Sequence, residues 1–110
     1  MVRMEAATKS NVTLAWSSSM DAWQELRLEL EREAEAIFAS SGEAIVVTPD
    51  RESGSVMMLI FRAKSLKLTY VPDKSAVRWD TADEYGFERI SEDTTSVARA
   101  LMRRLRRMGV

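Results

Sequence analysis

The 110-residue sequence contains neither cysteine nor histidine. Without cysteine the chain forms no disulfide, and it has no thiolate to act as a nucleophile or as a soft metal ligand. Without histidine it lacks the most frequent general base of enzymes and the most frequent protein ligand of zinc, copper and iron. We therefore expect no enzymatic activity, no cofactor and no transition-metal site. The lack of disulfides favours a cytoplasmic location.

Long apolar runs are also absent. The longest, from Val56 to Phe61, is much shorter than the roughly 18 to 20 residues of a membrane-spanning helix, and we expect no membrane segment. The charges nearly balance, with 16 lysines and arginines against 17 acidic residues, and 45% of the residues are hydrophobic, which excludes a disordered chain. This length and composition predict one globular domain.

The first residues differ from the rest of the chain. Residues 1–18 carry serine, threonine, asparagine and lysine and have few apolar anchors, so we expect a mobile leader before a single domain at 19–110. For part of this leader the alternative is a short strand, because apolar residues alternate at Val12, Leu14 and Trp16.

A helix is predicted to begin near Ser19, because the serines at this point are good N-caps and Ser18 with Asp21 approximates a capping box. Gly42 is expected to end it as a left-handed C-cap. Apolar residues recur in between with the spacing of one buried helix face, at Trp23, Leu26, Leu30, Ala34, Ile37 and Phe38.

After Gly42 the hydrophobic period changes from helical to alternating, which predicts strands at 44–48, 56–62, 65–71 and 85–90. Turn-forming residues at 49–54 and 72–75 predict hairpins. The join at 62–65 has no glycine, proline or asparagine, so residues 55–71 form either two strands or one long bent strand.

The loop at 72–75 determines the register of one hairpin. It pairs Val71 with Ala76 and Leu68 with Trp79, and this register places the large apolar side chains on one face and polar ones on the other. We therefore expect Trp79 in the core. Because aromatic residues in strands are mostly core residues, we expect the same of Tyr85 and Phe87 rather than a ligand-stacking cluster.

A last helix is predicted from the capping residues at 93–95 to about Met108, with Val97, Leu101 and Leu105 on its apolar side. The complete order predicts an α+β two-layer sandwich. It has an N-terminal helix, a four- to five-stranded antiparallel meander sheet and a C-terminal helix, with both helices on one face of the sheet.

Residues 56–61 are apolar at every position, so one of two alternating trios must point away from the helices. An apolar surface on the face without helices favours a binding partner. We assign this contact surface to Met57, Leu59 and Phe61 and expect a small non-catalytic protein-interaction module, either a homodimer or a complex with another protein. The alternatives are that the leader covers this surface or that a single chain buries both faces.

Nucleic-acid binding is the alternative function. From Thr94 to Val110 there are five arginines and no acid, and arginine forks match phosphate oxygens. The candidate residues are Arg99, Arg103, Arg106 and Arg107. We prefer a structural interpretation, in which these arginines pair with the first helix. Residues 19–38 hold six acids against two arginines, and no aromatic residues alternate with the arginines of the last helix.

The carboxylates of the first helix are weak evidence for a metal. Asp21, Glu25 and Glu29 recur every four residues on its polar side. A calcium site needs about six to eight converging oxygens, which one helix face does not supply. We interpret these carboxylates as a solvated helix face.

Overall fold

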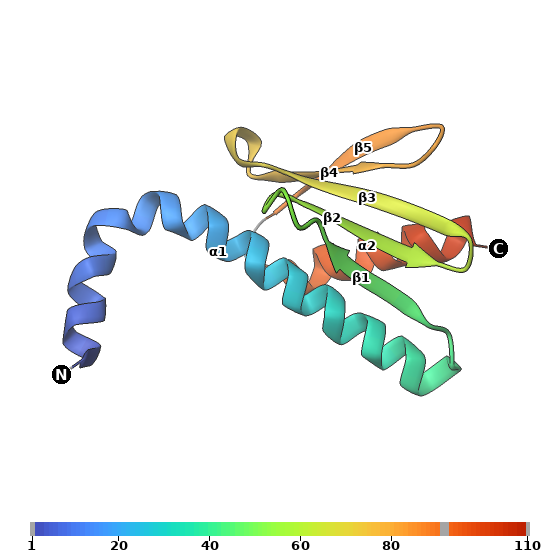
Figure 1. Ribbon diagram of the computed structural model, residues 1–110, viewed down its shortest axis with the longest axis horizontal. Helices are drawn as coiled ribbons and strands as arrows, with labels where there is room; N and C mark the ends of the chain where they lie inside the picture. The colour runs from blue at the N-terminus through green and yellow to red at the C-terminus, as the bar shows by residue number, and fades with distance from the viewer. Residues whose placement is uncertain (1, 91–92, 110) are drawn as a thin grey trace.

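The computed structural model describes the backbone of residues 2–90 and 93–109 and the side chains of residues 22–90 and 93–109 (Figure 1). The elements are, in chain order, α1 (Val2–Ser41), β1 (Ile45–Pro49), β2 (Val56–Phe61), β3 (Lys64–Val71), the short 3-10 helix η1 (Pro72–Lys74), β4 (Ala76–Asp80), β5 (Tyr85–Arg89) and α2 (Thr94–Met108). The predicted fold class, an α+β two-layer sandwich, is confirmed.

The five strands form one antiparallel sheet in the order β1-β2-β3-β4-β5, so strands that follow each other in the chain are also neighbours in space. Both helices lie against one face of this sheet (Figure 1). We call the opposite face the open face, because no element of the described chain covers it. Because consecutive strands are antiparallel neighbours, short hairpin connections are enough to join them.

The first helix is longer than expected. The prediction that it begins near Ser19 is wrong, because α1 begins at Val2, and the alternative of a strand at residues 12–16 is also wrong. Residues 2–18 contain neither glycine nor proline, so nothing in them interrupts a helix, and serine inside a helix costs only a fraction of a kcal/mol, about 0.5. The N-terminal part of α1 extends beyond the sheet (Figure 1). The leader and the domain boundary after residue 18 stay predictions.

The end of α1 is as predicted. Gly42 has a φ of 77°, which is the left-handed conformation that glycine adopts without steric cost. Its backbone N–H donates to the carbonyl oxygen of Phe38 at 2.8 Å and so closes the last turn.

The strand registers resolve the open question at residues 55–71. Phe61 pairs with Lys64 across a two-residue turn, so this segment forms two strands, and Arg62 in the turn has a φ of 57°. The register predicted for the next hairpin is confirmed, since Val71 pairs with Ala76 and Leu68 with Trp79.

The core lies between the helices and the inner face of the sheet. Leu59 is 0% exposed, and Met57 and Phe61 are also buried there. Our assignment of the contact surface to Met57, Leu59 and Phe61 is therefore wrong. The physical reason is register: Leu59 pairs with Leu66 and Met57 with Leu68, which places this trio on the apolar face of the neighbouring hairpin.

The N-terminus of α2 is capped as predicted. The carboxylate of Asp93 accepts hydrogen bonds from the backbone N–H of Ser96 at 3.2 Å and from its hydroxyl at 2.7 Å. These bonds, the side-chain bond first, lower the pKa of Asp93 below its ordinary value of 3.8.

This cap makes stability depend on pH in a defined direction. A carboxylate whose pKa is lower in the folded than in the unfolded chain stabilises the fold above the unfolded pKa, and that stabilisation is lost as the pH falls through the folded pKa. The Asp93→Asn variant keeps the cap acceptor but does not titrate. We expect the wild type to melt above this variant at neutral pH and the difference to shrink below about pH 4. Thermal melts followed by circular dichroism test this, and a difference that does not change with pH contradicts it.

Candidate functional site

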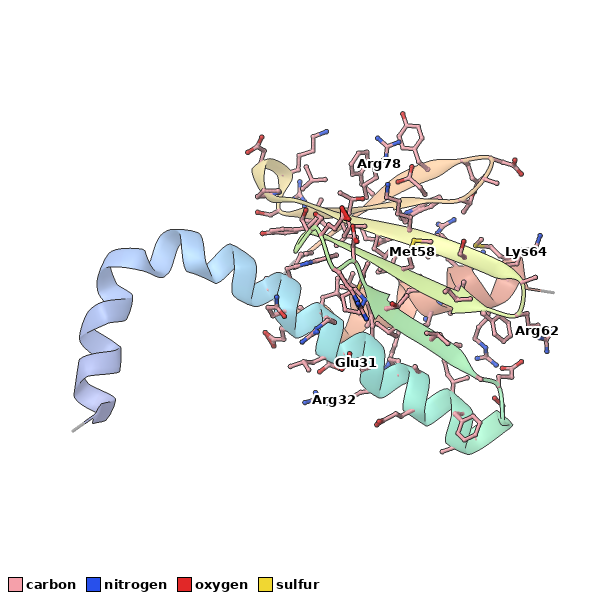
Figure 2. The ribbon with its side chains drawn as sticks, in the orientation of Figure 1. Glu31, Arg32, Met58, Arg62, Lys64 and Arg78 are labelled. Atoms are coloured by element: carbon pink, nitrogen blue, oxygen red, sulfur yellow. The ribbon has the colours of Figure 1, made fainter. Side chains whose placement is uncertain are left out.

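The open face carries an uncharged apolar surface on β1 and β2. Val46 pairs with Ile60 in the register, so the two side chains lie next to each other on this face. Val46 is 51% exposed, and the other members are half-buried. Met58 lies in the middle of β2 (Figure 2). The open-face patch, as we call it, consists of Val46, Val56, Met58 and Ile60.

Charged and aromatic side chains lie on the open face of β4 and β5. On β4, the Arg78 Nε donates to both carboxylate oxygens of Asp80 at 3.1 Å. On β5, Tyr85 is 60% exposed beneath the guanidinium of Arg78, and Phe87 is exposed beneath the ammonium of Lys74. The core position predicted for Tyr85 and Phe87 is therefore wrong.

Trp79 is buried, as predicted. Successive side chains of a strand point to opposite faces of the sheet, and this explains why Trp79 of β4 is buried while Tyr85 and Phe87 of β5 are exposed. Tyr85 pairs with Asp80 and Phe87 with Arg78, so both rings share the open face with these charged side chains, whereas Trp79 points to the helices.

Several arginines of α2 have acidic partners. Arg99 Nε lies 3.2 Å from Glu33 Oε2, a contact that joins α2 to α1. Arg104 Nη1 lies 3.9 Å from Glu84 Oε1, and its guanidinium stacks 3.8 Å from the centroid of the Trp79 ring. The predicted pairing of the two helices is confirmed for Arg99.

The C-terminal end of α2 forms a basic cleft of about 300 Å³. Glu43 lines this cleft and forms ion pairs with Arg106 and with Arg62, the latter at 3.5 Å between Nη2 and Oε2. The hydrogen bond from Arg106 lowers the pKa of Glu43, and the charge of Arg62 acts in the same direction. The residues that line the cleft are Glu43, Phe61, Arg62, Arg103, Arg106 and Arg107.

The charges in this cleft do not cancel. One carboxylate faces four arginines, and Arg103 and Arg107 form no ion pair within the described part of the chain. Sequence reasoning found Arg103, Arg106 and Arg107 but missed Arg62 and Glu43. Arg62 lies in the β2–β3 turn and Glu43 in the connection between α1 and β1, and no local sequence pattern shows that these two segments meet the end of α2.

Among the described residues, no three acidic side chains converge to form a metal site. The side chain of Asp21, one of the carboxylates considered in the sequence, lies outside the described residues. No helix in the same part of the chain is both long enough and apolar enough to cross a bilayer. The chain matches no family model, no curated protein and no solved structure.

Proposed function

We propose that the chain is a non-catalytic protein-interaction module that self-associates through the open-face patch. The observation that carries this proposal is the half-exposed Val46, next to three apolar side chains of β2, on a sheet face that no described element covers. Contiguous apolar surface of this kind costs free energy in water, and burial in an interface removes that cost. A cytoplasmic location is part of the proposal and rests on the lack of cysteine.

The composition of the patch favours a second copy as the partner. Neither β1 nor β2 contains a charged residue, so the patch offers no complement to a charged partner. Two identical patches that meet about a twofold axis bring apolar surface against apolar surface without an unpaired charge. Lys67, which pairs with Met58 on the neighbouring strand, borders the patch and stays solvated at its rim.

Charges inside the patch should dissociate the dimer. We expect Val46→Lys and Met58→Lys to convert a wild-type dimer into a monomer, because each buries an unpaired ammonium in the interface. Size-exclusion chromatography with light scattering measures this over a series of protein concentrations. Asp73→Asn, in the exposed η1, changes the net charge by the same amount outside the patch and should leave the dimer intact. A wild type that stays monomeric at high concentration refutes the proposal.

Nucleic-acid binding at the basic cleft is the second candidate. The cleft holds Arg103 and Arg107, which have no acidic partner among the residues whose side chains the structure describes, and adds Arg62 from the β2–β3 turn. Guanidinium groups at several points of one cleft can each contact a backbone phosphate and release its counterions. Arg99 is left out of this candidate, because it does not line the cleft.

Replacement of both Arg103 and Arg107 by glutamate should abolish binding to duplex DNA at low salt. We expect Glu43→Gln to strengthen binding, because it frees Arg62 and Arg106, and Arg99→Gln to have little effect. Fluorescence anisotropy across a salt series measures the affinities, and each arginine contact should contribute about one unit to the slope of log affinity against log salt. No binding by the intact protein at low salt eliminates this candidate.

A further inference from the structure

A groove runs between α1 and β1 on the helix side of the sheet. It has a volume of about 440 Å³. Phe38 of α1 is 60% exposed at this groove, and Ile45 and Val47 of β1 are half-buried in it. The complete lining is Glu31, Ala34, Glu35, Phe38, Ala44, Ile45 and Val47. The groove is therefore separate from the open-face patch, whose side chains point to the opposite face.

The edge of β1 beside this groove is free. β1 pairs only with β2 among the described strands, and the Asp50 N–H donates to the Val56 carbonyl at 3.0 Å. Because hydrogen-bonded and non-hydrogen-bonded pairs alternate in an antiparallel ladder, the backbone groups of Ile45 and Val47 point to the outer edge. Most edge strands are protected by charged side chains, but β1 has none, and only Pro49 limits its edge.

The groove carries negative charge without compensation. Glu31 and Glu35 line it, no lysine or arginine does, and neither carboxylate forms an ion pair within the described residues. Glu31 and Arg32 are neighbours on α1 (Figure 2), but Arg32 pairs with Glu29 instead. A ligand in the groove would therefore need positive charge near Glu31 and Glu35.

We propose that β1 accepts an extended peptide segment as an added strand, with lysine or arginine at every second position. The backbone of the segment pairs with the outward N–H and C=O groups of Ile45 and Val47. Its alternate side chains point to the groove, where their aliphatic stems cover Phe38 and their charged ends reach Glu31 and Glu35. This inference goes beyond the proposed function, because it uses the edge and the groove rather than the open-face patch.

The first test concerns charge. The probe is a fluorescently labelled peptide in which lysine and threonine alternate, and binding to the full chain is measured by fluorescence anisotropy. A peptide that alternates glutamate and threonine should bind at least about tenfold more weakly. The double variant Glu31→Lys with Glu35→Lys should weaken binding of the lysine peptide to the same extent. The double variant Glu25→Lys with Glu52→Lys, at two exposed positions outside the groove, changes the net charge by the same amount and should retain the wild-type affinity.

The second test concerns the backbone. Val47→Pro removes an outward N–H but no hydrogen bond of the β1–β2 ladder, so the fold should survive and peptide affinity should fall by about tenfold. Val47→Ala keeps the N–H and removes a similar amount of side-chain packing, so it should bind the peptide better than the proline variant. Melting curves of both variants establish that they are folded.

Two results overturn the inference. If Val47→Pro binds the lysine peptide as tightly as Val47→Ala, the attraction is electrostatic only and no strand is added. If Val47→Pro converts a dimer into a monomer while Val46→Lys and Met58→Lys do not, a second copy occupies this edge. A wild type that is monomeric but binds the peptide refutes the proposed self-association and leaves the inference standing.

Discussion

Replacement of Leu59 by alanine is expected to lower the free energy of unfolding by about 3 to 5 kcal/mol. Leu59 is completely buried in the centre of β2, where it pairs with Leu66 and lies in the core shared by both helices. The loss combines the transfer energy of the removed carbons with a cavity that packed neighbours fill only in part. Urea denaturation followed by the fluorescence of the buried Trp23 and Trp79 measures it.

The next residue in the strand is the control for this substitution. Met58 points to the open face, so Met58→Ala removes fewer buried contacts and should cost about 1 kcal/mol or less in a monomer. The same variant should weaken self-association, whereas Leu59→Ala should act on folding. The opposite result, in which Leu59→Ala keeps the wild-type free energy of unfolding and Met58→Ala lowers it strongly, would mean that β2 presents its other face to the helices.

Gly86→Ala is expected to lower the free energy of unfolding by about 1 to 3 kcal/mol, because it overpacks a closed contact. Gly86 pairs with Trp79, and a Cβ atom at residue 86 would lie 2.6 Å from Trp79 Cε2 and 2.9 Å from its Nε1. The indole has little freedom to move, since it is buried and the Arg104 guanidinium stacks on its ring. The strand must therefore shift, or the ring must leave its position.

Two comparisons isolate this steric effect in the same denaturation experiment. Gly54→Ala places its Cβ where no atom lies within 4 Å, so we expect no loss of stability from it. In a Trp79→Leu background the alanine at residue 86 finds more room, and it should cost less than it does beside tryptophan. Strictly additive effects of the two substitutions would show that the indole is not the obstacle.

Local patterns in the sequence predicted much of the fold. The caps at Gly42 and Asp93 and the alternation of the hairpin from Leu68 to Trp79 were predictable, because each depends on residues that are neighbours in the chain. The start of α1 was not. A serine-rich stretch without glycine or proline can cap a helix or continue one, and local preference differs too little between the two to decide.

The sequence did not predict which face of β2 points to the helices, because it did not predict the turn between β2 and β3. The sequence from Phe61 to Lys64 contains no residue that specifies a two-residue turn, so the register between β2 and β3 remained open. A change of register by one residue would exchange the two apolar trios of β2 between core and open face. Once Phe61 is known to pair with Lys64, the burial of Met57 and Leu59 follows from that of Leu66 and Leu68.

The candidate sites also have features that the sequence predicted and features that it did not. The arginines of α2 were predictable as a charged helix face, since helical periodicity is a property of consecutive residues. Arg99 has an acidic partner, whereas Arg103 and Arg107 have none within the described side chains, and this separation was not predictable because it depends on where Glu33 and Glu43 lie in space. Likewise, the groove beside β1 exists only because α1 packs against the edge strand of the completed sheet.

The amino-acid sequence therefore determined most of the helices and strands, apart from the start of α1, because short-range sterics and periodicity govern them. The tertiary structure decided which apolar side chains are buried, which arginines have an acidic partner and, among the described strands, which one lies at the sheet edge beside the groove. These properties depend on pairings between residues that are distant in the chain, and a single turn at Arg62 and Ala63 determines several of them at once.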